Sequence, residues 1–104
     1  MFDIGKMMSQ VKEMKQKAEE IQAELAQKEE SATAGGTMVT VRLNGHFEMT
    51  DLQLSDALYA AHDPAMTRDL IIAAHNEAVR KMQKTVAKEM QKVTGGLPLP
   101  PGLF

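Results

Sequence analysis

The chain has 104 residues, no cysteine and a formal net charge of −2. This length suits one small domain with a marginal core, and the missing thiols exclude disulfides, cysteine nucleophiles and cysteine-based zinc sites. Because no apolar run approaches the roughly 18 residues of a membrane span, and the first residues lack the apolar core of a secretory signal, we expect a soluble cytoplasmic protein without a membrane partner.

Residues 3–28 carry apolar side chains on a seven-residue frame, which predicts a long helix with a coiled-coil seam of about four heptads. The seam consists of Ile4, Met7, Val11, Met14, Ala18, Ile21 and Leu25. Such a helix is about 38 Å long, more than a small globule needs internally, so we expect it to pack along another long helix. Its charges scatter as a solvated face, with Lys12 and Lys15 as secondary candidates for phosphate contact.

A hairpin is predicted after this helix. Residues 37–43 alternate apolar and polar side chains, as a half-buried strand requires, and residues 46–54 form the returning strand. Asn44-Gly45 stands between them, the dipeptide typical of a two-residue type I′ turn. The hairpin therefore places its apolar residues on one face.

A third strand, at about residues 29–34, completes the sheet because a two-stranded hairpin is only marginally stable. Gly35-Gly36 supplies the turn that joins it to the next strand. The result is a short antiparallel meander that needs a helix, or a second copy of itself, across its apolar face. The fold class is therefore α+β, with two long helices flanking a small three-stranded antiparallel sheet.

A second long helix, residues 64–93, follows the sheet. Ser55 is a plausible N-cap for one helical turn through Asp56–Tyr59, and Asp63-Pro64 provides the N-cap and first position of the long helix. Gly95-Gly96 ends it, because glycine adopts the left-handed conformation that closes helices. We therefore expect a single domain at residues 1–96.

Residues 97–104 form a Pro-rich C-terminal tail that cannot continue a helix. Two alternatives stay open for it. One is a disordered or polyproline-like end. The other is docking of its large apolar side chains on an apolar groove, including one on a partner subunit; these are Leu97, Leu99, Leu103 and Phe104.

The second long helix is amphipathic from Val79 onward. Its apolar residues fall within about 80° of arc and its basic residues within about 120° on the opposite side. The apolar arc holds Val79, Met82, Val86, Met90 and Val93. The basic stripe holds Arg80, Lys81, Lys84, Lys88 and Lys92, with Glu77 as the single acid among them. Residues 70–78 are apolar nearly all round, so we expect that part to be buried and the later part to project as an arm.

Charge is segregated along the chain, with −5 over residues 29–76 and +3 over residues 77–104. Lysines that stand four apart, such as Lys84 and Lys88, destabilise an isolated helix by about 0.2–0.5 kcal/mol per pair. A polyanionic partner would turn this cost into affinity. The basic stripe is therefore the leading candidate for a binding surface.

Catalytic or metal chemistry finds no support in the sequence. His46, His62 and His75 fall in a strand, a loop and a helix, without the spacing of convergent metal ligands. His75 fits better as a hydrogen-bonded core or interface residue. No nucleophile elbow or phosphate-cradling glycine loop is present. We expect a non-enzyme without metal, cofactor or small-molecule substrate.

The whole pattern resembles the YbaB/EbfC nucleoid-associated proteins. The resemblance rests on the N-terminal heptads, on Val39-Thr40-Val41 running to Asn44-Gly45, on Ala73–Ala78, and on Thr94-Gly95-Gly96-Leu97-Pro98-Leu99-Pro100. It implies a homodimer with tweezer-like projecting helices that binds DNA in the nucleoid without a cofactor. Ser55-Asp56 departs from the Asp-Pro common at that place in the family, which leaves the local turn open.

The functional hypothesis is that the basic stripe contacts the phosphates of double-stranded DNA. Lysine dominates over arginine in the stripe, so we expect little direct base reading. One alternative is that the bases merely keep the helix soluble; another is a dimeric helical interaction or scaffold protein. Self-association is expected in either case, because the first-helix seam and the small sheet leave apolar surface that one chain can hardly cover.

Overall fold

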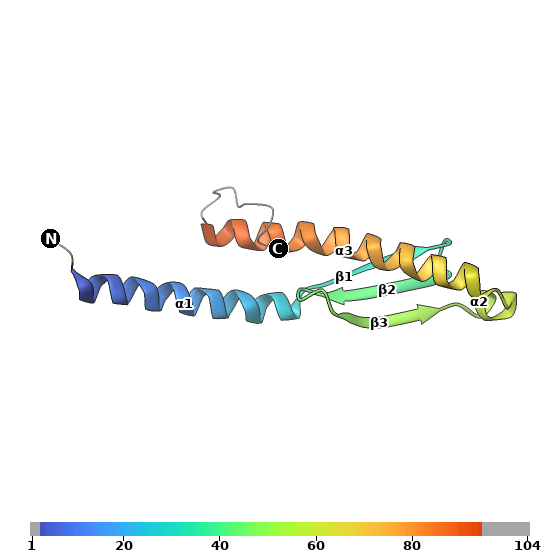
Figure 1. The fold of residues 1–104 in the computed structure, drawn as a ribbon, viewed down its shortest axis with the longest axis horizontal. Coiled ribbons are helices and arrows are strands. Elements are labelled where there is room, and N and C mark those ends of the chain that lie inside the picture. The colour runs from blue at the N-terminus through green and yellow to red at the C-terminus, as the bar shows by residue number, and fades with distance from the viewer. Residues whose placement is uncertain (1–2, 95–104) are drawn as a thin grey trace.

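The computed structural model describes residues 3–94 and shows an elongated molecule of 72 × 21 × 17 Å. The elements in chain order are α1 (Ile4–Gln27), β1 (Glu29–Ala34), β2 (Val39–Asn44), β3 (Met49–Leu54), α2 (Asp56–Ala61) and α3 (Pro64–Thr94). The sheet and α2 form one end of the molecule, and α1 and α3 run toward the other end (Figure 1). The predicted α+β class, with two long helices and a three-stranded antiparallel sheet, is confirmed.

The sheet has the order β1-β2-β3 with both pairs antiparallel. β2 starts at Val39, later than the predicted residue 37, because Met38 still belongs to the turn and donates its N–H to the Gly35 carbonyl at 3.3 Å. Gly35 and Gly36 have φ angles of 63° and 72°, a region that favours glycine. The turn between β1 and β2 is therefore the one whose backbone conformation favours glycine.

The second turn differs from the predicted two-residue type I′ turn. The Asn44 side-chain oxygen accepts the backbone N–H groups of His46 at 2.9 Å and Glu48 at 3.1 Å. The residue with a left-handed backbone is Phe47, at φ 62°. The prediction was wrong because an Asx-type side-chain bond supports a longer turn here, and β3 accordingly begins at Met49 instead of residue 46.

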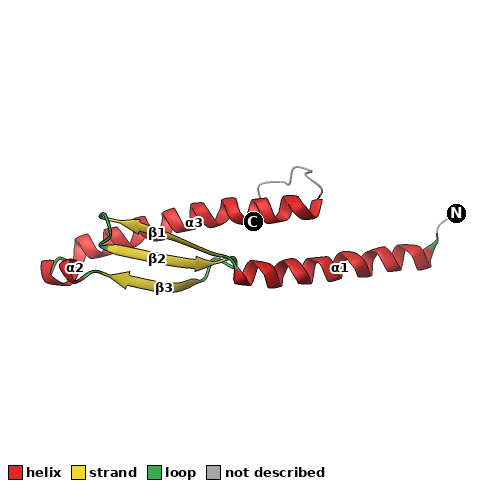
Figure 2. Ribbon diagram, turned by 180° about the vertical axis from the view of Figure 1, so that it is seen from behind, coloured by secondary structure: helices red, strands yellow, loops and turns green. Residues whose placement is uncertain are grey.

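Gly45 is needed for a close approach. Its N–H donates to the Leu25 carbonyl at the end of α1 over 3.0 Å, and a Cβ at this position would lie 2.1 Å from that oxygen. No ordinary side chain fits there without a shift of the backbone. This contact joins α1 to the sheet and directs it away from the strands (Figure 2).

We therefore expect Gly45→Ala to displace the end of α1 and to lower the free energy of unfolding by about 1–3 kcal/mol, the usual cost of overpacking. Urea unfolding followed by circular dichroism measures the loss. Gly36→Ala is the matched control, because a Cβ there meets nothing within 4 Å and only the positive φ opposes it. A larger loss in the control than in Gly45→Ala would contradict the close-approach explanation.

α3 covers β1 and β2 on one face of the sheet and forms the main core with them. Val39, Val41 and Leu43 of β2 are fully buried, and so are Ala74 and Ala78 of α3. The small alanines let the helix backbone approach the strands closely, and each large side chain buried here stabilises the fold by about 1.5–3 kcal/mol.

Side-chain caps start both helices that follow the sheet. The Ser55 hydroxyl accepts the Leu58 N–H at 3.2 Å, and the Asp63 carboxylate accepts the Met66 N–H at 3.0 Å. Both capping predictions are confirmed. α2 continues to Ala61, beyond the single turn expected, and ends at His62 in the left-handed conformation with φ 49°.

Among residues 3–94, α1 packs on other elements only near its C-terminal end. Leu25 forms a small cluster with Met82 and Val86 of α3, and Ile21 and Met90 border it. The earlier part of the α1 seam is exposed. We expected α1 to pack along another long helix, and within residues 3–94 it does so against α3 only over its last turns. We also expected both long helices to flank the sheet, but α1 extends away from the sheet and only α3 lies against it.

Candidate nucleic-acid interface

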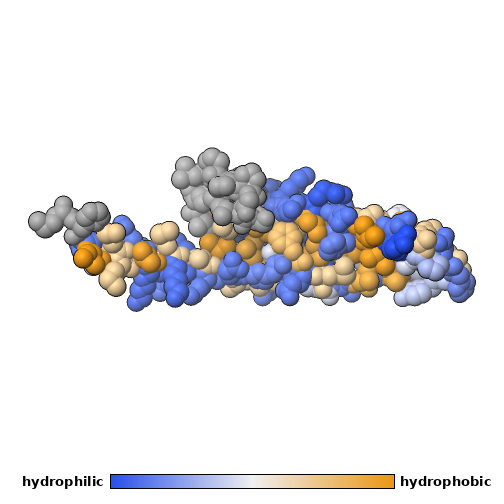
Figure 3. Space-filling view, in the orientation of Figure 1, coloured by the Kyte–Doolittle hydropathy of each residue, from blue (hydrophilic) through white to orange (hydrophobic). Residues whose placement is uncertain are grey.

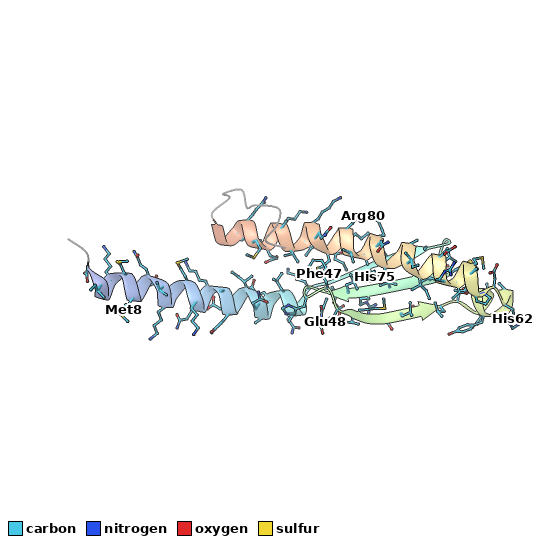
Figure 4. The ribbon with its side chains drawn as sticks, in the orientation of Figure 1. Met8, Phe47, Glu48, His62, His75 and Arg80 are labelled. Atoms are coloured by element: carbon cyan, nitrogen blue, oxygen red, sulfur yellow. The ribbon has the colours of Figure 1, made fainter. Side chains whose placement is uncertain are left out.

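Most of the basic stripe lies on the outer side of α3, away from the sheet, and its Lys81 reaches the edge strand β1. All five of its side chains are exposed. Arg80 points away from the strands (Figure 4), and hydrophilic residues gather along this side of the helix (Figure 3). The buried Ala74 and Ala78 on the opposite side fix this orientation, because they hold that side of α3 against the strands.

Arg80 is engaged by an acid of its own helix. Its guanidinium donates to a single Glu77 carboxylate oxygen from Nη2 at 2.6 Å and from Nε at 3.0 Å. This hydrogen bond and the Arg80 charge hold the pKa of the Glu77 carboxyl below its ordinary value, and the charges of Lys81 and Lys84 add to the effect. Both partners are about half exposed, so the pair contributes little stability and leaves Arg80 able to turn toward another anion.

Lys81 has a structural contact in addition to its charge. Its ammonium donates to the Ser31 carbonyl of β1 at 2.9 Å. Nearby, the Thr85 hydroxyl donates to the Glu30 carboxylate at 2.7 Å. These two bonds hold α3 to the outer edge of the sheet, and Lys81 therefore sets the rotation of the helix as well as its charge.

Lys92 belongs to an ion-pair network that joins both long helices. Glu89 is only 8% exposed and accepts from Lys28 at 3.1 Å and from Lys92 at 3.2 Å. The hydrogen bond from Lys28, followed by that from Lys92, lowers the pKa of the Glu89 carboxyl against the opposing effect of burial. Sequence reasoning missed Lys28 as a partner because it lies beyond the end of α1, far from Glu89 in the chain.

Within residues 3–94, Lys84 and Lys88 are the two stripe residues that make neither a salt bridge nor a hydrogen bond to another element. Both are exposed, and among residues 3–94 no salt bridge of 4.0 Å or less involves either one. Lys84 also borders a shallow hollow of about 460 Å³, lined by Glu77, Arg80, Lys81, Gln83, Lys84 and Ala87. The middle of the stripe therefore presents the most available positive charge.

Lys12 and Lys15, the secondary candidates, are exposed on α1. The first part of this helix extends past the end of α3 (Figure 1). These lysines are not brought into the hollow beside Lys84. They form a separate group on the other helix.

The face of the sheet away from α3 is polar. Ser31, Arg42 and Asp51 lie side by side across the three strands, and Thr33, Thr40 and Gln53 do the same further along. Arg42 is the single basic residue in the strands of residues 29–54. This face therefore offers no second basic surface, and the helices carry the charge that a polyanion would meet.

The histidines do not converge with acids. Within residues 3–94, no group of three or more His, Cys, Asp or Glu residues could hold a metal ion. The Nδ1 atom of His75 is buried and has no hydrogen-bond partner in this part of the chain.

None of the described helices is long and apolar enough to cross a membrane.

The Glu89 network predicts a pH dependence of the contact between α1 and α3. Because its pKa in the folded chain lies below 4.5, ionised Glu89 stabilises this contact above that pH, and the stabilisation is lost as pH falls through the lower folded value. An NMR titration of the Glu89 carboxyl carbon should therefore have its midpoint below 4.5, the ordinary value. The Leu25 methyl signals should follow the same midpoint, and in Glu89→Gln they should not; a Glu89 midpoint at or above the ordinary value would contradict the assignment.

Comparison with known proteins gives one consistent result. The profile of the YbaB/EbfC DNA-binding family matches residues 1–97. A nucleoid-associated protein of Rhizobium meliloti (strain 1021) is 44% identical over 103 residues, which cover 99% of this chain and 96% of that protein. A nucleoid-associated protein of Brucella ovis is 41% identical over 102 residues, with 98% and 95% covered.

The crystal structure of an uncharacterized protein from Helicobacter pylori has the same fold. Its TM-score is 0.78 at 20% identity, and the match covers 90% of this chain and 99% of that one. The extended arrangement of long helices beside a three-stranded sheet is therefore known from a solved structure.

Proposed function

Because the chain belongs to the YbaB/EbfC DNA-binding family, we propose that it binds duplex DNA mainly through phosphates, as a homodimer, with little direct base reading. It is a nucleoid-associated DNA-binding protein and not an enzyme, as its family and its relatives indicate. The observation that carries the proposed binding mode is the exposed, unpaired charge of Lys84 and Lys88 in the middle of the basic stripe.

The chemistry of the stripe favours phosphate over base edges. Lysine is a compact point charge on a flexible stem, whereas base recognition in the major groove relies on bidentate Arg, Asn or Gln contacts. The single arginine of the stripe is already engaged by Glu77. Sequence preference would then arise from the shape of the duplex.

The second copy is proposed to cover β3. Residues directly opposite in an antiparallel pair point to the same face, and Leu52 and Met49 stand opposite the fully buried Val41 and Leu43. Leu52 is nevertheless 41% exposed and Met49 43%, because α3 lies mainly over β1 and β2. The part of the apolar face that β3 contributes through Met49 and Leu52 is thus left open at the edge of the sheet.

This open face continues onto the helices. A groove of about 610 Å³ begins beside it, lined by Leu54, Leu58, Tyr59, His62, Asp63, Pro64, Thr67, Arg68, Ile71 and Ile72. Ile72 is 51% exposed and the neighbouring Ala73 is exposed too, which corrects the expectation that residues 70–78 are buried nearly all round. An apolar strip this continuous is typical of a surface that another subunit covers.

A dimer through this face would carry two basic stripes. If Lys84 and Lys88 of each subunit each neutralise one phosphate, the logarithm of the binding constant falls with the logarithm of the salt concentration at a slope of about −3.6. A duplex-binding titration at several salt concentrations, on duplexes of unrelated sequence, tests both the slope and the weak sequence dependence. Binding that does not change with salt would overturn the phosphate model.

The alternative is a dimeric scaffold for another protein, and the exposed seam of α1 is what favours it. It predicts duplex binding no stronger than that of an ordinary acidic protein. It also predicts a stoichiometric protein partner in pull-downs after nuclease treatment. The salt titration therefore separates the two functions.

A further inference from the structure

We propose that the exposed first half of α1 pairs, in antiparallel direction, with the same stretch of α1 in a second copy of the chain. The seam residues left free there, with their exposed fractions, are Ile4 69%, Met7 48%, Val11 65% and Met14 69%. The free end of α1 accordingly shows an apolar surface (Figure 3), and such a surface is typical of an interaction site. The Pro-rich tail expected at residues 97–104 lies outside the described residues.

The shape of this seam fits a side chain of another helix. Ile4, Met7, Met8 and Val11 line a hollow of about 330 Å³. These four residues have the spacing i, i+3, i+4 and i+7, which is the set that surrounds one inserted side chain in coiled-coil packing. The hollow therefore suits an apolar side chain that projects from a second helix.

The same stretch of a second copy supplies that helix when it runs in the opposite direction. With Met7 opposite Val11 of the second copy, Ile4 comes to lie opposite its Met14, and symmetry repeats both pairs. Val11 of each copy then lies over the hollow of the other. Met8 of each copy meets its equivalent beside the symmetry axis, which widens the apolar contact. The seam is therefore complementary to itself.

The charges beside the seam favour this direction. In the antiparallel pair Asp3 lies beside Lys17 of the second copy, which gives one ion pair at each end of the contact. Both side chains are exposed, and within residues 3–94 no salt bridge involves either one. In a parallel pair the corresponding neighbours carry no opposite charges; they are Asp3 with Met8, Gln10 with Lys15 and Lys17 with Gln22.

The position of α3 also favours the antiparallel direction. Lys17 and Glu20 of α1 share a groove of about 300 Å³ with Glu89 and Lys92 of α3, so the end of α3 at Thr94 lies beside the middle of α1. A parallel second helix on the open seam would run into α3. An antiparallel helix continues past the N-terminal end of the first α1, so each copy keeps its own α3 in place.

The paired stretch is short, so the contact is weak. Residues 4–14 span only about 15 Å of helix, and small interfaces of this kind are transient. We expect the contact at about millimolar concentration and not at micromolar concentration. It uses neither the basic stripe nor the β3 face. It therefore joins separate dimers where they are crowded.

The natural chain has no cysteine, so engineered cysteines report the arrangement directly. The full-length variants Ile4→Cys and Met14→Cys are mixed at about 1 mM, where contacts with millimolar dissociation constants are populated. Under mild oxidation the mixture should form a disulfide-linked pair with one chain of each kind, identified by its mass. Neither variant alone should link, because two copies of either residue lie about 15 Å apart along the antiparallel pair.

The matched control mixes Ile4→Cys with Glu13→Cys. Glu13 is next to Met14 but lies about 160° from Val11 around α1, so this mixture should stay reduced. Linking of each single variant without the mixed link would mean a parallel pair and would overturn the proposal. The absence of any link, or equal linking with Glu13→Cys, would overturn it too.

A further variant separates this contact from the proposed β3 interface. The mixed link between Ile4→Cys and Met14→Cys should still form when both chains also carry Leu52→Asp, because Leu52 lies on β3 and not on the seam. Loss of the link in that background would contradict a second, independent contact surface. Its persistence would support the α1 contact even if the β3 dimer were wrong.

Methyl NMR supplies an independent measurement without a crosslink. The Met7 and Met14 methyl signals of the natural chain should shift as its concentration rises from about 0.05 to about 1 mM. Val11→Asp should abolish these shifts, and Ser9→Asp should keep them, because Ser9 lies about 160° from Val11 around α1. The buried Val39 methyl signals should stay constant in all three chains, which shows that the fold is intact. Met7 and Met14 shifts that are absent in the natural chain, or unchanged in Val11→Asp, would overturn the proposal.

Discussion

Replacing Lys84 and Lys88 with glutamate should reduce duplex affinity on the order of a thousandfold at low salt. In a dimer the double substitution removes four phosphate contacts, each of about 1 kcal/mol for a charge pair at 4 Å in water. A loss of about 4 kcal/mol corresponds to a factor of roughly a thousand in the dissociation constant. The four new carboxylates would add repulsion to this loss. Electrophoretic mobility shift or fluorescence anisotropy on a random-sequence duplex measures it.

The same change of charge at other exposed positions is the control. Lys6 and Lys17 lie on α1 outside the predicted contact set, and both are exposed. The Lys6→Glu, Lys17→Glu chain should keep most of its affinity, and a chain with Lys84→Arg and Lys88→Arg should bind like the natural one. Equal losses in the two glutamate variants would mean that net charge governs binding, and the stripe would lose its special role.

The basic stripe could be predicted from the sequence. Which of its residues are free of other contacts, and so able to bind phosphate, could not. Helical periodicity places all five bases on one side of α3, and a Glu-Arg pair three residues apart is visible in the sequence. The bond from Lys81 to the Ser31 carbonyl depends on where β1 lies beside the helix. Lys92 forms an ion pair with Glu89, which also pairs with Lys28. Lys28 precedes the sheet in the sequence and Glu89 follows it, so this contact cannot be predicted from neighbouring residues. Tertiary contacts therefore leave Lys84 and Lys88 as the sites of greatest expected effect.

The strands and both long helices are predicted by local sequence patterns. The predictions were wrong where a contact between residues far apart in the sequence determines the structure. Alternation and helical periodicity depend on neighbouring residues alone, and the elements they predict are present. Gly45 was read as a turn residue because Asn-Gly favours a tight hairpin. Its actual constraint is the Leu25 carbonyl, which belongs to another element. The exposed first half of α1 escaped prediction for the same reason, since the length of α3 sets how much of the seam it covers.

Replacing Leu52 with aspartate should convert the proposed dimer into a monomer. In the single chain Leu52 is 41% exposed, so the carboxylate remains solvated there and the fold is kept. In the dimer each subunit would bury an unpaired charge at about 3 kcal/mol or more, and two such sites raise the dissociation constant of the dimer roughly ten-thousandfold. Sedimentation velocity at micromolar concentration measures the change.

Gln53→Asp is the matched control for this variant, because Gln53 follows Leu52 directly but lies on the opposite, polar face of the sheet beside Thr40. It introduces the same charge into the same strand and should leave the dimer intact. Duplex binding by Leu52→Asp should also weaken and its salt slope should fall to about half, since one subunit supplies half of the phosphate contacts. A Leu52→Asp chain that still sediments as a dimer would exclude the β3 face as the interface. If that chain is monomeric but its salt slope is unchanged, the two stripes do not act together on one duplex.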